Sequence, residues 1–417
     1  MTTPILGVAP SLIKFLLIFR VYFSKPQFDH LTRYCGGLLI TEGRKYVSTM
    51  HRQMVDAKDQ SCSNRFITEA PWDEEALNEA RIRESYSQIL AEGKKKGIKR
   101  IFFIGDNTVT EKRHRSAKGL KKRQRMEGVS KNYSTTHKGT VWSSNAVTTH
   151  LLLEDKDIPL YLTSYAGKKG CPKEEYKSEV ELMIEQIEKF DLPEGFDSYF
   201  LTDCFYNCQD VKNACEKKEF EGIVGKIKCN RIIEKVDGLK LEGIPVQHLL
   251  IWLSNRRNHG FTKRTIRDHD GKKKKVWVRA LRCNIRNYGE GKIVLVTPKL
   301  RPKPPKSKKE KVPGTYLASS DLKLSLDEIL EFIGLRWTIE TFYQIVKERY
   351  GWRDYKFLKL KSIERHWHLI FLIYTFDALE AARNQVRKEN LVSFISFVRK
   401  KALEGNSTDQ IVQALVA

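Results

Sequence analysis

Three carboxylates in this 417-residue chain have the residue type and the predicted placement that metal-dependent phosphate chemistry needs. Asp106 and Asp203 each end a short apolar run, and Glu340 lies on a predicted helix. Magnesium prefers oxygen ligands and keeps several waters, so two or three carboxylates are enough to hold it. Two ions about 4 Å apart activate an oxygen nucleophile, stabilise the leaving oxygen and neutralise the phosphate. The pattern therefore predicts phosphodiester transfer on two Mg²⁺ ions, with Mn²⁺ as a substitute.

The glutamate has two cationic neighbours at helical spacing. Arg336, Glu340 and Lys347 are separated by offsets of four and seven residues, which places them along one stripe of a helix, beside its apolar face. The same spacing also describes a solvent-exposed Arg–Glu ion pair, worth only about 0.3–0.5 kcal/mol. Taken alone, the spacing favours that surface pair, so the surrounding sequence has to decide.

Arg336, Glu340 and Lys347 also match the last three members of the pattern Tyr-x2-Arg-x3-Glu-x6-Lys. The block 335–347 resembles the Tyr-Arg-Glu-Lys signature of DDE cut-and-paste transposases from prokaryotic insertion sequences. These enzymes belong to the ribonuclease-H-like, retroviral-integrase superfamily. Ile333 stands in the tyrosine position, which is a departure from the signature.

Two upstream segments are similar to the blocks that carry the family's aspartates. Residues 100–108 contain Asp106, followed by Asn107 where the family commonly has a second aspartate. Residues 199–206 contain Asp203. The resemblance covers most of residues 20–385.

The resemblance implies a DNA transposase that cuts at the ends of a mobile element and joins the freed 3′ hydroxyl to target DNA. Asp106, Asp203 and Glu340 would be its catalytic residues and metal ligands. Arg336 and Lys347 would contact DNA phosphates, which fixes the strand without reading its sequence. Relatives bridge two DNA ends and pass through a hairpin intermediate. The expected partners are therefore terminal inverted repeats, target DNA and a second copy of the chain, as a homodimer on DNA.

Two other functions stay open. A nuclease of the same fold would cut plain or branched DNA without strand transfer, and the absence of the signature tyrosine at Ile333 is compatible with that. A catalytically silent, transposase-derived DNA-binding protein is the other, although the full carboxylate set argues against it. Singly, Asp106 could instead cap a turn with Asn107, and Asp203 could begin a helix.

The elements that must position the carboxylates are predicted from short apolar runs. Strands are expected at residues 100–106, 146–153, 158–165, 199–203 and 220–228, with helices at 173–190 and about 209–218. The order βββαβαβ is typical of an α/β fold with a ribonuclease-H-like mixed sheet as its core. In such a sheet the fourth strand lies beside the first, which would bring Asp203 next to Asp106.

A β-rich insertion is predicted to split this core before the glutamate helix. It contains strands at 274–283 and 292–296 around a turn at 287–291, then a basic, Pro-rich loop at 301–311. A strand at 315–319 follows, and Ser325 and Glu328 form a capping box at the start of the next helix. The predicted domains are a helical N-terminal DNA-binding region (1–98), the first part of the core (99–229), the insertion (230–312), the second part of the core (313–360) and a helical C-terminal region (361–417).

Net charge supports a polyanionic partner. The chain has 75 Lys+Arg against 51 Asp+Glu, a formal net charge of +24. Basic residues gather at 112–125, 272–279 and 301–311. The first cluster is predicted to lie over bound DNA, although a solvated loop would have the same composition; its predicted DNA contacts are Lys112, Arg113, Arg115, Lys121, Lys122 and Arg123. Trp277 adjoins the second cluster and could stack on an extruded base, or simply pack within the fold.

Neither membrane spans nor disulfides are expected. The apolar stretch 5–23 is broken by Lys14 and Arg20, and the run 369–376 is too short to cross a bilayer. The eight cysteines show no repeated spacing and no CxxC pair, and the group Cys204, Cys208 and Cys215 lacks a recognisable fourth zinc ligand. These features predict a cytoplasmic, nucleoid-associated protein with reduced thiols.

Overall fold

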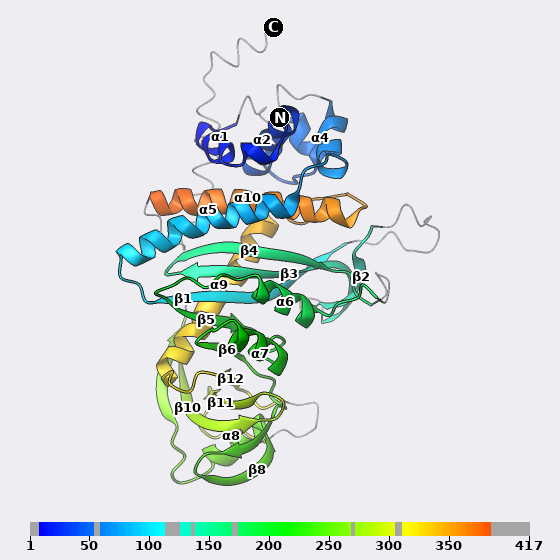
Figure 1. The fold of residues 1–417 in the computed structure, drawn as a ribbon. Coiled ribbons are helices and arrows are strands. Elements are labelled where there is room, and N and C mark those ends of the chain that lie inside the picture. The colour runs from blue at the N-terminus through cyan, green and yellow to red at the C-terminus, as the bar shows by residue number, and fades with distance from the viewer. Residues whose placement is uncertain are drawn as a thin grey trace. The chain divides into compact units, whose positions relative to one another are not determined.

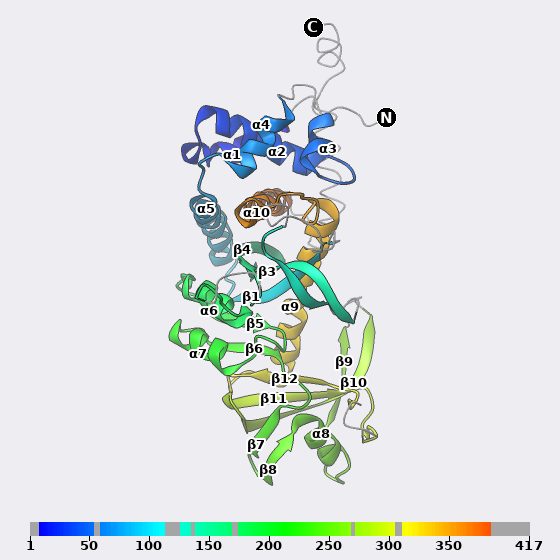
Figure 2. The same cartoon turned by 90° about the vertical axis from the view of Figure 1, so that its right-hand side faces the viewer.

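The computed structural model describes residues 8–53, 59–112, 126–134, 138–168, 174–267, 272–304 and 311–384 (Figure 1, Figure 2). They form a mixed α/β structure in which helices accompany a large sheet of parallel and antiparallel strands. The predicted class is confirmed at this level. The chain forms two compact units: the first unit comprises residues 1–97, 107–178 and 341–417, and the second unit comprises 98–106 and 179–340.

The first unit combines helices from both ends of the chain with antiparallel strands. Strand β3 pairs with β1, β2 and β4. The described elements of this unit are α1 (Pro10–Leu17), the 3₁₀ turn η1 (Arg20–Tyr22), α2 (Lys25–Ile40), α3 (Val47–Arg52), α4 (Gln60–Thr68), α5 (Glu74–Lys95), β2 (Val129–Ser134), β3 (Gly139–Leu153), β4 (Lys156–Tyr165), α10 (Leu360–Arg383) and the later parts of β1 (Arg100–Glu111) and α9 (Leu326–Arg349).

Helix α10 forms the buried centre of the first unit. It packs against β4, α5, α2 and α4, and Figure 1 shows it running beside α5 along one face of β4. The apolar run 369–376 is buried throughout. Arg81 of α5 is also buried, and it donates hydrogen bonds to the carbonyls of Pro159 (2.7 Å) and Leu160 (2.9 Å) on β4. Within the described part of the chain, no helix is long and apolar enough to span a membrane.

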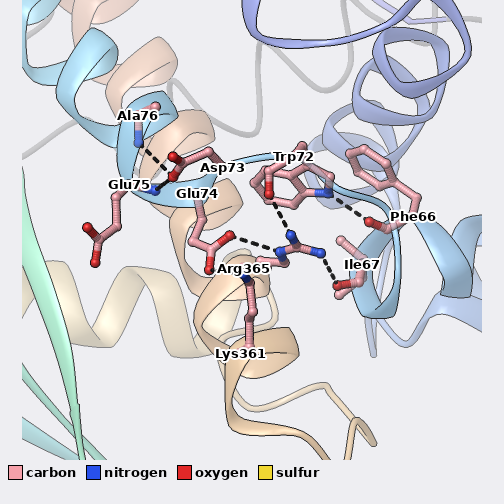
Figure 3. A network of polar contacts seen from close by, with 9 residues as sticks. All are labelled: Phe66, Ile67, Trp72, Asp73, Glu74, Glu75, Ala76, Lys361 and Arg365. Carbon is pink, nitrogen blue, oxygen red and sulfur yellow. Dashed lines mark hydrogen bonds and ion pairs between the residues drawn. The ribbon is translucent and has the colours of Figure 1, made fainter.

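Arg365 joins α10 to the segment between α4 and α5 (Figure 3). Its guanidinium donates to the carbonyls of Ile67 (3.1 Å) and Trp72 and pairs with Glu74 at 3.0 Å. Asp73 caps α5 by accepting from the backbone N–H groups at the start of that helix. The start of α5 is therefore fixed both by its own cap and by a buried cation from a distant part of the sequence.

The second unit contains the three parallel strands on which the predicted site depends. Its strands are hydrogen-bonded in the order β1-β5-β6-β12-β11-β10-β7-β8, with β9 pairing with β10. The β1–β5 and β5–β6 pairs are parallel. The described elements are the first part of β1, α6 (Glu179–Glu188), β5 (Asp197–Thr202), α7 (Gln209–Lys217), β6 (Gly222–Lys226), β7 (Ile232–Val236), β8 (Leu239–Pro245), α8 (Val246–Ser254), β9 (Thr262–Arg267), β10 (Lys273–Ile285), β11 (Gly289–Thr297), β12 (Thr315–Ser319) and the first part of α9.

Several details of the predicted strands and helices were wrong. Strand β1 continues to Glu111, so Asp106 lies within the strand and not at its end; the extension is paired, because the N–H of Lys112 donates to the carbonyl of Trp142. Strand β2 was not predicted, since its sequence VSKNYS has no apolar run. Helix α6 begins at Glu179, several residues later than expected. Strand β3 begins at Gly139, seven residues before the expected start at 146, whereas the other predicted strands and α7 occur within a few residues of their expected positions.

Candidate active site

The two predicted aspartates follow equivalent positions on neighbouring parallel strands. Gly105 of β1 is opposite Thr202 of β5 in the parallel register. The next residue on each chain segment is Asp106 or Asp203. The expectation that the aspartate strands would be neighbours is confirmed, whereas the catalytic role of the aspartates stays a prediction.

Close packing fixes the backbone at this level of the sheet. A Cβ at Gly105 would lie 2.6 Å from Cζ of Phe200 and 2.7 Å from Sδ of Met183, so any larger residue would require these side chains to move. On β6, Gly225 pairs with Thr202 and would place a Cβ 2.8 Å from the carbonyl oxygen of that residue. Lys226 follows Gly225. The three parallel strands thus present two acids and one cation in equivalent positions.

Asp203 is half-buried, and one of its oxygens shapes the turn after β5. Oδ1 accepts hydrogen bonds from the N–H groups of Phe205 (2.8 Å) and Tyr206 (3.2 Å). Among the described residues, Oδ2 accepts no hydrogen bond. Helix α7 starts only at Gln209, after Cys208, so the alternative in which Asp203 begins that helix is wrong. The turn uses one carboxylate oxygen and leaves the other for a ligand.

Arg336 lies buried between the other two carboxylates. Its Nη1 is 3.3 Å from Oδ2 of Asp106, and its Nη2 donates to Oε1 of Glu340. The Arg336 side chain is 4% exposed, against 14% for Asp106 and 34% for Glu340. Its Nε is buried and has no hydrogen-bond partner within the described part of the chain. The predicted helical Arg–Glu pair is present, but it is largely buried and includes a second acid.

All three predicted acids act on the same guanidinium. Burial works to lower the pKa of Arg336, but the negative charges of Asp106, Glu340 and Asp203 outweigh it and raise that pKa. Arg336 therefore stays charged and supplies the positive charge that balances the acidic cluster.

The donor set suits a hard divalent cation. Asp106, Asp203 and Glu340 provide only carboxylate oxygens, which are the ligands that Mg²⁺ and Mn²⁺ prefer. In the arrangement shown, no group of three His, Cys, Asp or Glu side chains among the described residues lies close enough to hold one metal ion. The residues fit the metal chemically, and the guanidinium would have to give up at least one carboxylate to let it bind.

Two of the predicted DNA contacts, Lys347 and Lys112, have local partners in the first unit. Nζ of Lys347 donates to the carbonyl of Val109 at 3.4 Å. Nζ of Lys112 donates to the carbonyl of Arg353 at 3.0 Å and lies 3.0 Å from the centroid of the Tyr355 ring. Burial lowers the pKa of Lys112 to about 7, against the attraction of a nearby carboxylate. Arg113, Arg115, Lys121, Lys122 and Arg123 lie outside the described residues.

Trp277 lies half-buried in the sheet of the second unit. It is opposite Lys263 on β9 and Thr297 on β11. The Lys263 ammonium lies 5.9 Å from the Trp277 ring, and the ring of His259 is 6.1 Å away. Trp277 therefore has packing partners of its own, and its contact with a nucleobase stays a prediction.

Phe205, Lys226 and Lys228 were not among the residues predicted, although they lie close to Asp203 in the sequence or in the sheet. Phe205 is 42% exposed, and it is one of the few large hydrophobic side chains that are exposed among the described residues. Its signal in the sequence is an aromatic residue two positions after an aspartate that ends an apolar run. Lys226 had no such signal, because only the strand register brings it beside the aspartate.

No protein-family model and no curated protein matches this chain.

Proposed function

We propose that this protein is a DNA transposase of the Tyr-Arg-Glu-Lys group. It would cut DNA at the ends of a mobile element and then transfer the freed 3′ hydroxyl to a target phosphodiester. In each step one P–O bond is broken and one is formed. A dimer on DNA would hold two element ends together.

One observation supports this function most directly: the parallel register that sets Asp106 and Asp203 side by side, together with the shared contact of Asp106 and Glu340 with Arg336. Three acids that lie about a hundred residues or more apart in the sequence therefore interact with one guanidinium, that of Arg336. A structural ion pair would need only one acid for one arginine.

The strand pairings support a ribonuclease-H-like core. Strand β1 pairs with β3, and β3 pairs with β4, whereas β5 and β6 extend the sheet from β1 in parallel. Within the second unit the first strand thus has the aspartate strand beside it in parallel, and within the first unit the next two long strands pair with each other. This is the neighbourhood that the predicted fold requires.

The chain's own residues would bind and orient the reactants. Asp106, Asp203 and Glu340 would hold two Mg²⁺ or Mn²⁺ ions, which supply nucleophile activation and charge neutralisation when bound. Oδ1 of Asp203 accepts two hydrogen bonds from the turn after β5, and these fix the direction of its other carboxylate oxygen, Oδ2. Arg336 balances the acids and, once released from a carboxylate, could pair with a DNA phosphate.

A cleavage assay tests this function. The substrate is a duplex that carries the inverted repeats flanking the coding sequence, incubated with Mg²⁺, Mn²⁺ or EDTA and a supercoiled target plasmid. We expect metal-dependent cuts at the repeat ends and covalent joining to the plasmid. Cuts that ignore the repeats and yield no joined product would indicate a nuclease instead. DNA binding without any cut would indicate a silent binding protein.

A further inference from the structure

An exposed aromatic ring stands next to the carboxylate of Asp203. The backbone N–H of Phe205 donates to Oδ1 of Asp203 at 2.8 Å, so the same turn fixes both residues. The Phe205 ring is 42% exposed and packs edge-to-face on the buried ring of Tyr206, with centroids 5.0 Å apart and planes at 84°. The Phe205 ring thus has a buried aromatic partner while much of its own surface is exposed.

Three cations surround the same turn. Lys226 ends β6, one residue after the Gly225–Thr202 pair. Nδ2 of Asn207 donates to the carbonyl of Lys226 at 3.3 Å, and the N–H of Arg231 donates to the carbonyl of Lys228 at 2.9 Å, so both lysines belong to the segment packed against the turn. Nη2 of Arg231 donates to the carbonyl of Asn207 at 3.4 Å. Within the described part of the chain, none of the three cations forms an ion pair with an acid.

We propose that Phe205, Lys226, Lys228 and Arg231 form a platform that binds one unpaired nucleotide beside the reacting phosphate. The ring would stack on the base, and the cations would contact the phosphates on either side. Base–aromatic stacking tolerates any base, because every base has a π-face. Cations at this position attract the backbone irrespective of sequence. The platform rests on the proposed function, because it assigns the nucleotide next to the cut.

The platform gives unpaired DNA a specific advantage over paired DNA. A base within a duplex is already stacked on its neighbours, so the Phe205 ring can stack on it only after the base has left the helix. The cations, by contrast, contact the backbone of either form. Loss of the ring should therefore affect only DNA with an unpaired base, whereas loss of a cation should affect both forms.

Fluorescence titration tests the platform with two duplexes that differ only by one bulged 2-aminopurine. In EDTA, wild-type protein should quench the bulged probe and bind it more tightly than the paired duplex. Phe205→Ala should lose about tenfold in affinity for the bulged duplex, lose the quenching, and bind the paired duplex normally. Phe205→Trp should restore both effects. Lys228→Ala should weaken binding of both duplexes and lower the salt slope by about one.

Two matched variants complete the experiment. Tyr133→Ala removes another exposed aromatic ring, in the first unit, and Lys240→Ala removes an exposed lysine on β8; both should behave as wild type. The platform is overturned if Phe205→Ala quenches and binds as wild type does, or if Trp277→Ala alone removes the quenching. Either result can coexist with repeat-specific cleavage, so the proposed function would survive it. Wild-type protein that binds neither duplex would overturn both proposals.

Discussion

Gly105 on β1 faces Thr202 on β5, and each of these residues is followed by an aspartate. Residues opposite each other in a parallel pair project to the same face of the sheet. A shift by one residue would turn one of the two aspartates to the other face. Phe103 on β1 and Phe200 on β5 are buried before this point and both pack on the ring of Phe220, with centroids 5.3 Å and 5.9 Å away, which holds the two strands in register. Packing in the core thus determines the geometry of the candidate site.

Replacing Asp203 by asparagine separates the charge of this residue from its role in the turn. Asparagine can still accept from the N–H groups of Phe205 and Tyr206, so the free energy of unfolding should change by less than about 1 kcal/mol. Metal-dependent DNA cleavage should fall by at least about a hundredfold, because a metal ligand contributes several kcal/mol. DNA binding in EDTA should not change.

The matched control for this substitution is Asp210→Asn, which removes an exposed carboxylate from the first turn of α7. It should cut as wild type does. Gel assays of cleavage and urea unfolding measure the two effects separately. Cleavage by Asp203→Asn at the wild-type rate would contradict the assignment of Asp203 to the metal site.

Local signals in the sequence predicted the elements that bear the acids. Strand β12 has the predicted bounds Thr315–Ser319, and the capping box of the next helix is present: Ser325 and Glu328 exchange hydrogen bonds of 2.7 Å and 3.2 Å between side chain and backbone. Both depend on residues close together in the chain. The order of the predicted strands followed from the same signals, although β2 was missed.

Features that depend on distant partners were missed. Helix α8 and strands β7, β8 and β9 were not predicted individually, since short elements in an insertion are fixed by pairing across the sheet. The burial of Arg336 was missed for the same reason. Its spacing from Glu340 was visible in the sequence, but its second partner, Asp106, is 230 residues away. Neither pattern nor spacing reveals that contact.

Replacing Arg336 by methionine should destabilise the metal-free protein. Asp106 and Glu340 would lose their common cation, and breaking a buried pair costs about 3–5 kcal/mol. Glu340 is partly exposed, so we expect a loss of about 2 kcal/mol at pH 7. Mn²⁺ should restore more stability in the variant than in the wild type, because the metal no longer competes with the guanidinium. Urea unfolding with MnCl₂ or EDTA measures both effects.

Arg282→Met is the control for Arg336→Met, since Arg282 is an exposed arginine on β10 of the same unit. It should change stability by less than about 0.5 kcal/mol, with or without Mn²⁺. Equal stabilisation of wild type and Arg336→Met by Mn²⁺ would show that the guanidinium does not compete with the metal.

His366 should make stability depend on pH below neutrality. This buried imidazole donates from Nε2 to the carbonyl of Gly351 (3.0 Å) and accepts at Nδ1 from the hydroxyl of Tyr34 (2.8 Å), which suits its neutral form. Burial lowers the pKa of His366 from 6.5 to about 4. Between these values the unfolded chain binds a proton that the folded chain does not. The contribution is therefore complete above pH 6.5 and is lost as the pH falls to about 4.

This loss amounts to about 3 kcal/mol for a single group with that difference in pKa. Urea unfolding from pH 4 to 7 should show a shallower pH dependence for His366→Gln than for wild type. The exposed His248→Gln variant should keep the wild-type slope. Identical slopes for His366→Gln and wild type would exclude His366 as the source.

Arg365 should contribute far more to stability than Lys361, although both pair with Glu74 (Figure 3). The Arg365 side chain is 4% exposed and also donates to the carbonyls of Ile67 and Trp72, so Arg365→Met removes this donor from both carbonyls and leaves Glu74 with the exposed Lys361 alone. We expect a loss of about 3 kcal/mol in the free energy of unfolding. Lys361 is 65% exposed and 3.5 Å from Glu74, so Lys361→Met should cost less than about 0.5 kcal/mol. Urea unfolding compares the two, and equal losses would mean that burial of Arg365 adds nothing to the ion pair.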